Sequence, residues 1–127
     1  MPSESDVLTV NATVHGTDRA VVAVGGQLDA DTSVVLRHQL AALTLQGRNH
    51  IVLDLALVPF MDSSGLNGVL RVRSEILRHG GQLVLAAPAA PVRRLLDLTG
   101  VSMATPVHET TDLALASFPA EPSDQEA

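Results

Sequence analysis

The feature that most constrains the fold is a short apolar run followed closely by the start of an amphipathic helix. Residues 51–55 are almost entirely apolar, and Pro59 leads into the segment Phe60-Met61-Asp62-Ser63-Ser64-Gly65-Leu66. This order predicts a buried strand, a loop and a helix that begins at the two serines. Apolar side chains then recur at helical spacing, at Leu66, Val69, Val72 and Ile76, with Leu70 and Leu77 widening the stripe.

A serine at the start of a helix can serve in two ways. Its side-chain oxygen can accept a hydrogen bond from an unpaired backbone N–H group, which makes it a helix cap. Its hydroxyl can also accept a phosphate, which the N–H groups and the positive end of the helix dipole would stabilise. The motif by itself favours the role of helix cap. The choice between cap and phosphate acceptor therefore depends on the other motifs of the chain.

Strand and helix patterns alternate along the remaining sequence. Residues 8–14 alternate apolar and polar side chains, and a turn at Gly16-Thr17-Asp18 connects them to the apolar residues 20–24. Asp31, Thr32 and Ser33 are candidate caps for a first helix that ends near Gly47. We expect further helices at 64–79, from Pro91 to Gly100 and at 110–118, and further strands at 82–86 and 104–107.

These patterns predict a single α/β domain over residues 1–118. Its sheet is mixed and mostly parallel, opens with an antiparallel hairpin, and has about five strands and four helices. The chain has 127 residues, which is too few for two domains of ordinary size. The segment 119–127 is rich in proline and acidic residues, and we expect a disordered acidic tail there.

The composition argues against an enzyme. All eight basic residues are arginine, and without lysine the chain lacks a residue that P-loop NTPases, Schiff-base enzymes and protein kinases need. It has no cysteine, no Gly-x-Ser-x-Gly hydrolase motif and no metal-ligand spacing among its five histidines. We therefore expect no catalytic residues, no metal site and no cofactor.

Charge and hydropathy narrow the possible partners. The net charge of −6 disfavours nucleic-acid binding, and the arginines form no block longer than Arg93-Arg94. No apolar run approaches the roughly 18 residues of a membrane span. The N-terminal residues lack a signal-peptide pattern, so we expect a cytoplasmic protein without a membrane partner.

Three motifs together resemble a known family. Asp62-Ser63-Ser64-Gly65-Leu66 is similar to the signature of bacterial anti-sigma-factor antagonists, or anti-anti-sigma factors, which are small free-standing STAS domains. Gly26-Gln27-Leu28-Asp29 resembles the end of that family's second strand, and residues 92–101 resemble its third helix. The matches extend from about residue 7 to residue 118 in the family's order. One departure is Asn67, where close relatives often carry a small residue.

The resemblance implies a phosphorylation-controlled regulator. When unphosphorylated, such a protein binds an anti-sigma factor that is also a serine kinase, and a sigma factor is released. Phosphorylation of the first serine, Ser63 here with Ser64 as second choice, ends the complex, and a serine phosphatase reverses it. The residues implied in partner binding are Asp29, Asp62, Ser63, Ser64, Gly65, Leu66 and Asn67.

The residues themselves leave alternatives open. Asp29, Asp31 and Asp62 are also typical helix caps or turn formers. Arg71, Arg73 and Arg78 read first as a solvated helix face, on which Arg71 and Glu75 have the spacing of an ion pair, and second as partner contacts. A second hypothesis is therefore a non-catalytic STAS accessory subunit of a transport or stress-signalling assembly, in which Ser63 is only a helix cap. Nucleotide binding at the same loop is a weaker third hypothesis, because the loop lacks a phosphate-binding glycine motif.

Overall fold

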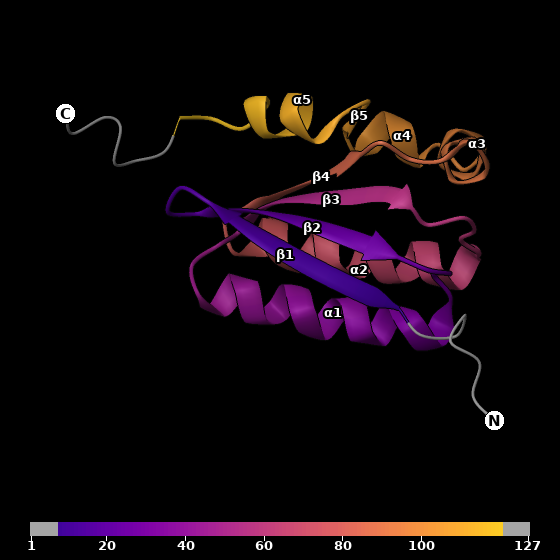
Figure 1. Ribbon diagram of the computed structural model, residues 1–127, viewed down its shortest axis with the longest axis horizontal. Helices are drawn as coiled ribbons and strands as arrows, with labels where there is room; N and C mark the ends of the chain where they lie inside the picture. The colour runs from indigo at the N-terminus through magenta and orange to yellow at the C-terminus, as the bar shows by residue number, and fades with distance from the viewer. Residues whose placement is uncertain (1–7, 121–127) are drawn as a thin grey trace.

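The computed structural model describes residues 8–120, which form one five-stranded sheet with five helices (Figure 1). The strands are β1 (Thr9–His15), β2 (Arg19–Gly25), β3 (His50–Leu57), β4 (Gln82–Ala86) and β5 (Val107–His108). The helices are α1 (Ala30–Leu45), α2 (Ser63–Arg78), α3 (Ala90–Leu98), α4 (Val101–Ala104) and α5 (Thr111–Ala116). The strands lie in the order in which they occur along the chain. This confirms the predicted α/β class.

The sheet is mixed, as predicted. Strands β1 and β2 pair antiparallel around a tight turn, in which Gly16 adopts a positive φ of 58° that suits glycine. Strands β2, β3, β4 and β5 pair in parallel, so each connection between them must cross over the sheet. The carboxyl ends of β2, β3 and β4 therefore lie along the same edge of the sheet.

Strand β3 is buried on both faces because its side chains alternate between two apolar clusters. Ile51, Leu53 and Leu55 belong to the main core, which also contains the buried faces of α1 and α2. Val52 points to the second cluster with Val84, Ala86, Ala114 and Phe118. This explains why residues 51–55 read as an almost continuous apolar run.

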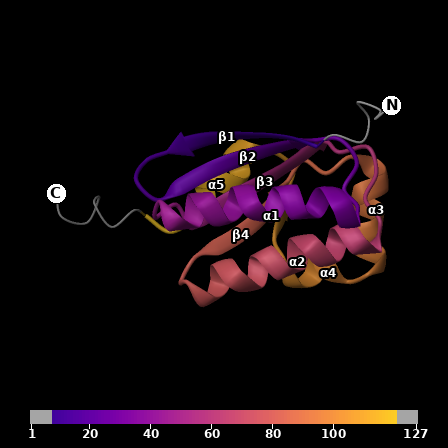
Figure 2. The same ribbon diagram turned by 90° about the horizontal axis from the view of Figure 1, so that it is seen from below.

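Helices α1 and α2 lie side by side against one face of the sheet, and both begin at its carboxyl edge (Figure 2). Helix α1 buries Leu36, Leu40 and Leu43, which recur at helical spacing on the face that packs against the sheet. Helix α5 packs against the opposite face and contributes Ala114 to the second cluster. The sheet is therefore covered on one face by α1 and α2 and, over β3 to β5, on the other face by α5.

The C-terminal third differs from the prediction in two ways. Residues 101–104 form the short helix α4, which raises the number of helices from the expected four to five. Strand β5 comprises only Val107 and His108, so the predicted strand at 104–107 is wrong over most of its length. The cause is Gly100, whose left-handed conformation at φ 80° ends α3 and starts another helical turn.

The last described residues are held against the amino ends of β2 and β3. The ring of Phe118 meets the ring of His50 edge-on at 5.3 Å, and the guanidinium of Arg19 lies 5.6 Å from the Phe118 ring centre. Arg19 also pairs with Asp18 and donates to the carbonyl of Pro119. The expected disordered tail at 119–127 lies outside the described residues from 121 onward, as do residues 1–7 of the expected domain.

Candidate functional site

The cap of helix α2 is Asp62 and not a serine. The Asp62 carboxylate accepts a hydrogen bond from the backbone N–H of Gly65 at 2.9 Å, and its backbone is extended as an N-cap requires. Helix α2 begins at Ser63, one residue earlier than predicted. The interpretation of Ser63 as the helix cap is therefore wrong.

Both serine hydroxyls are consequently uncommitted. Ser63 and Ser64 are the first two residues of α2, and their side chains are exposed. Among residues 8–120, neither hydroxyl has a hydrogen-bond partner. Asp62 accepts the N–H of Gly65 on its carboxylate and the N–H of Leu66 on its carbonyl, whereas the N–H groups of Ser63 and Ser64 have no partner in the described part of the chain. The site thus presents two hydroxyls beside the positive end of a helix dipole.

Asp29 has the same role at the start of α1. Its Oδ1 accepts from the backbone N–H groups of Asp31 and Thr32, both at 3.0 Å, while the Thr32 hydroxyl accepts from the Asp29 N–H at 3.0 Å. The backbone N–H of Thr32 lowers the pKa of Asp29, with the Thr32 hydroxyl and the Asp31 N–H acting in the same direction. Asp31, Thr32 and Ser33 lie inside the helix, so none of them is its N-cap residue; of the three, only Thr32 contributes to the cap, through its hydroxyl in a capping box with Asp29.

The loops that follow β2 and β3 are joined along their backbones. Leu28 and Met61 form a parallel bridge, the Leu28 N–H donates to the Phe60 carbonyl at 3.1 Å, and the Asp62 N–H donates to the Leu28 carbonyl at 3.2 Å. Asp29 and Asp62 each follow a bridged residue directly. The structure therefore brings the two acidic caps together next to Ser63, at the carboxyl edge of the sheet.

Gly65 is required for this close approach. A Cβ atom at Gly65 would lie 2.3 Å from the carbonyl oxygen of Leu28, far inside van der Waals contact. Gly68 has a similar role one turn later, where a Cβ would lie 2.5 Å from the Cβ of Ser33 in α1. The glycine of the Asp-Ser-Ser-Gly motif therefore positions the serines by letting α2 pack against the neighbouring loop.

The seven predicted partner-binding residues fall into three groups. Ser63, Ser64 and Asn67 are exposed, while the capping residues Asp29 and Asp62 are half-buried. Gly65 and Leu66 are buried, and Leu66 is only 5% exposed, so both support the helix from inside. A docked partner could contact the exposed and half-buried residues directly. The buried Gly65 and Leu66 would affect binding only because they fix the position of α2.

Sequence reasoning missed two large apolar side chains near the site. Leu57, at the end of β3, is 71% exposed, and Phe60, in the loop before Asp62, is 48% exposed. Phenylalanine is enriched in protein interfaces, and burial of either side chain against a partner would remove apolar area from water. The available signal was the apolar run that continues past residue 55 into the loop.

The described residues give no support for a metal centre or a membrane span. Across residues 8–120, no three histidine, aspartate or glutamate side chains lie close enough to hold a metal ion. In the same range, no helix combines the length and the apolar character needed to cross a bilayer.

Comparisons with known proteins identify the family. The sequence model of the STAS domain matches residues 9–114. The anti-sigma F factor antagonist of Paenibacillus polymyxa is 36% identical over 105 residues, which cover 82% of this chain and 90% of that protein. The solved anti-sigma factor antagonist of Mycobacterium paratuberculosis superposes with a TM-score of 0.78 at 26% identity, over 92% of this chain and 97% of that one.

More distant structures share the fold. The anti-sigma factor antagonist SpoIIAA in its unphosphorylated form superposes with a TM-score of 0.72 at 23% identity, covering 84% of this chain and 93% of that one. Its phosphorylated form gives a TM-score of 0.67 at 22% identity, covering 85% and 97%. The fold, the matched domain and the similarity to the Paenibacillus protein lead to one conclusion: the chain is a STAS domain of the anti-sigma-factor antagonist family.

Proposed function

We propose that this protein is an anti-sigma-factor antagonist controlled by phosphorylation of Ser63. The unphosphorylated protein binds an anti-sigma factor that is also a serine kinase, and a sigma factor is released. The kinase then transfers phosphate from ATP to Ser63, which ends the complex, and a serine phosphatase restores the active form. The cycle takes place in the cytoplasm. The main support is the exposed Ser63 hydroxyl, which has no partner in the described part of the chain because Asp62 caps the helix.

The fold should tolerate a phosphate at this position, because the N-terminus of α2 offsets part of the repulsion from the neighbouring carboxylates and the remainder is smaller than the stability of an ordinary domain. A phosphoserine adds about −1.5 to −2 charges. Two unit charges about 6 Å apart in a medium of effective dielectric about 40 repel each other by about 1.4 kcal/mol, which is the scale expected for a nearby carboxylate such as Asp62. The N-terminus of α2 offsets about 1–2 kcal/mol of that repulsion.

A docked partner does not tolerate the phosphate equally well. Phe60 and Leu57, in the segment that leads from the end of β3 to the serines, supply apolar contact area, which a close interface would bury. A doubly charged group placed between these side chains and the partner would have to be desolvated or would hold the surfaces apart. Phosphorylation can therefore break the complex without unfolding the domain.

Ser63 is the preferred acceptor over Ser64. The family's modified residue is the first of the pair, which corresponds to Ser63. Ser63 is also the first helical residue, immediately after the Asp62 cap, whereas Ser64 lies one position further along and lines a hollow between α1 and α2. A kinase that needs an accessible hydroxyl reaches Ser63 more easily.

Intact mass spectrometry tests the proposal. The protein is incubated with the serine-kinase anti-sigma factor of the same organism and ATP, alongside the variants Ser63→Ala and Ser64→Ala. We expect the parent and Ser64→Ala to gain one phosphate and Ser63→Ala to gain none. A serine phosphatase should remove the added mass. Phosphate mapped only to Ser64, or no mass gain with an active kinase, would contradict the proposal.

One observation favours the accessory-subunit alternative. Asp29, Asp62 and Gly65 all have structural functions in the loops, so the motif would be useful even if no phosphate were ever attached. In that case Ser63→Asp would leave every protein interaction unchanged. In a phosphorylation-controlled antagonist, the same substitution weakens binding to the anti-sigma factor.

A further inference from the structure

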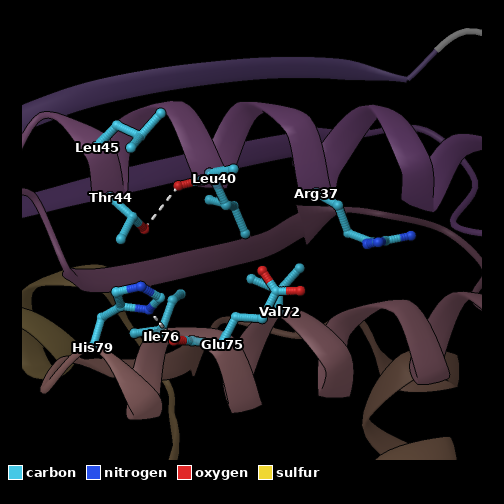
Figure 3. Close-up of a pocket in the computed structure, with 9 residues that line it drawn as sticks. Arg37, Leu40, Thr44, Leu45, Val72, Glu75, Ile76 and His79 are labelled. Carbon is cyan, nitrogen blue, oxygen red and sulfur yellow. Dashed lines mark hydrogen bonds between the residues drawn. The ribbon is translucent and has the colours of Figure 1, made fainter.

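A groove runs between α1 and α2, starting at the serine site. Its first part has a volume of about 320 Å³ and is lined by Ser33, Arg37, Ser64, Asn67, Gly68 and Arg71, among others. Its second part has a volume of about 210 Å³ and extends toward the end of α2, past Leu40, Val72, Ile76 and His79 (Figure 3). Arg37 belongs to both parts. We call the two parts together the interhelical groove.

The two arginines that line the groove have no bonded partner in the described part of the chain, unlike most of its other arginines. Arg19, Arg48, Arg73 and Arg93 each bond to a carbonyl or a carboxylate. Among residues 8–120, Arg37 and Arg71 have no hydrogen-bond or ion-pair partner, although Arg37 is half-buried. Arg71 and Glu75 have ion-pair spacing, but no ion pair forms between them. A half-buried guanidinium with five unused donors is well suited to bind a carboxylate.

The groove changes in character along its length. Arg37 and Arg71 make the end near Ser64 basic, in a protein whose net charge is −6. The middle is apolar, because Leu40, Val72 and Ile76 form its floor, and Figure 3 shows Glu75 and His79 on the α2 side of this part. An occupant that matches this order carries a carboxylate at the serine end and an apolar group beside it.

We propose that the interhelical groove docks a segment of the anti-sigma factor that has this chemistry. An aspartate or glutamate of that segment binds between Arg37 and Arg71, and an adjacent apolar side chain packs against Leu40 and Val72. This inference rests on the proposed function, since it names the surface that the partner uses. Charge complementarity supports it: a basic groove end on an acidic protein selects an acidic side chain.

The groove also explains how the phosphate would act on binding. Ser64 lines the basic end, and Ser63 is its neighbour in the chain. A phosphate on Ser63, one residue before the groove-lining Ser64, adds negative charge at the end of α2 where the basic part of the groove starts, and there it weakens the attraction for the partner's carboxylate. The switch therefore acts on a specific ion pair and not only on surface fit.

Charge reversal in the groove tests the inference. The affinities of Arg37→Glu and Arg71→Glu for the serine-kinase anti-sigma factor are measured by titration calorimetry. Arg78→Glu is the matched control, because Arg78 is exposed on the same helix, does not line the groove and changes the net charge equally. We expect each groove variant to bind about 30-fold more weakly or worse, and the control to change less than about threefold. Arg37→Met, which keeps an unbranched stem, should show most of the loss. Circular dichroism checks that each variant is folded.

A charge exchange identifies the other half of the pair. The exposed acidic residues of the anti-sigma factor are changed to arginine one at a time, and one of these variants should restore binding to Arg37→Glu. If the parent binds the anti-sigma factor and Arg37→Glu binds equally well, the groove inference is wrong and the proposed function stands. If the parent binds no anti-sigma factor at all, the proposed function is wrong and the inference is overturned with it.

Discussion

The two ends of the parallel strands use their polar side chains in opposite ways. At the amino ends of β2 and β3, Asp18, Arg19 and His50 contact one another, and Arg19 and His50 also contact the Phe118 ring. At the carboxyl ends, Asp29 and Asp62 bond to backbone N–H groups, while the exposed Ser63 hydroxyl has no partner in the described residues. At the amino ends the polar side chains are used in contacts within the domain, whereas at the carboxyl ends a serine hydroxyl is left accessible for modification.

This difference shows how a small domain can carry a modifiable residue without weakening its fold. The hydrogen bonds that start α1 and α2 come from the aspartates, so the serines contribute little to stability. At the carboxyl edge, stability and exposure therefore fall to different residues. At the amino edge they do not, because Arg19 and His50 contact Asp18 and also hold Phe118 in place. We therefore expect substitutions at the amino edge to affect stability, and substitutions at the serines to affect binding.

The largest effect on stability is expected from Phe118→Ala. Phe118 is only 6% exposed and packs in the second apolar cluster with Val52 and Val84. Removing a buried phenylalanine ring typically costs about 3–5 kcal/mol, and we expect about 3 kcal/mol here because the residue lies near the end of the described chain. Urea denaturation followed by circular dichroism measures the loss.

A neighbouring leucine provides the control for this change. Leu113 in α5 is 55% exposed, so Leu113→Ala should change the free energy of unfolding by less than about 0.5 kcal/mol. At a temperature where Phe118→Ala is still folded, its affinity for the anti-sigma factor should equal that of the parent. A specific loss of binding in this folded variant would show that the two ends of the strands are not independent.

Gly65→Ala should have the next largest effect. The added methyl group would meet the Leu28 carbonyl oxygen at 2.3 Å, so α2 or the loop after β2 must shift. Overpacking of this kind costs about 1–3 kcal/mol, and we expect the upper half of that range because the clash is with backbone. Thermal denaturation followed by circular dichroism measures the loss, and the adjacent Ser64→Ala, which has no such clash, should stay within about 0.5 kcal/mol of the parent in that measurement. Equal stability of Gly65→Ala and the parent would mean that α2 is not held against this loop.

A smaller effect concerns pH. The N–H groups of Thr32 and Asp31 hold the pKa of Asp29 below its ordinary value of 3.8 in the folded protein. Its stabilising contribution is therefore complete above the ordinary carboxyl pKa and declines as the pH falls toward the lower folded-state pKa. Asparagine caps helices as well as aspartate does, so Asp29→Asn should match the parent near neutral pH and lose less stability between pH 5 and 2. Urea denaturation across that range compares the two slopes, and parallel slopes would contradict this assignment.

Much of the fold could be predicted from the sequence because its signals are local. The alternation in β1, the apolar runs of β2 and β3 and the helical stripe of α2 each identify an element without knowledge of its neighbours. The residues after Gly100 were harder to predict. Helix α4 has a single turn and no buried side chain, and β5 has two residues, so neither produces a recognisable period.

The candidate site was only partly predictable. The motif indicated that a helix begins at the serines and offered both Asp62 and Ser63 as its cap, and only the hydrogen bond that the Asp62 carboxylate accepts from the Gly65 N–H decides between them. The role of Gly65 depends on the Leu28 carbonyl, 37 positions earlier in the chain, and appears only when the two loops meet. Arg37 carried no signal at all, because its importance comes from the position of α1 relative to α2.

The most direct test of the account compares the affinities of Ser63→Asp, Ser63→Ala and the parent for the serine-kinase anti-sigma factor by titration calorimetry. All three should unfold at nearly the same urea concentration, since the Ser63 side chain is exposed and Asp62 still caps α2. We expect Ser63→Ala to bind like the parent, and Ser63→Asp to bind more weakly by about 2–4 kcal/mol, or roughly 30- to 1,000-fold. If Ser63→Asp is folded and binds as tightly as the parent, the phosphorylation switch is wrong and the accessory-subunit hypothesis takes its place.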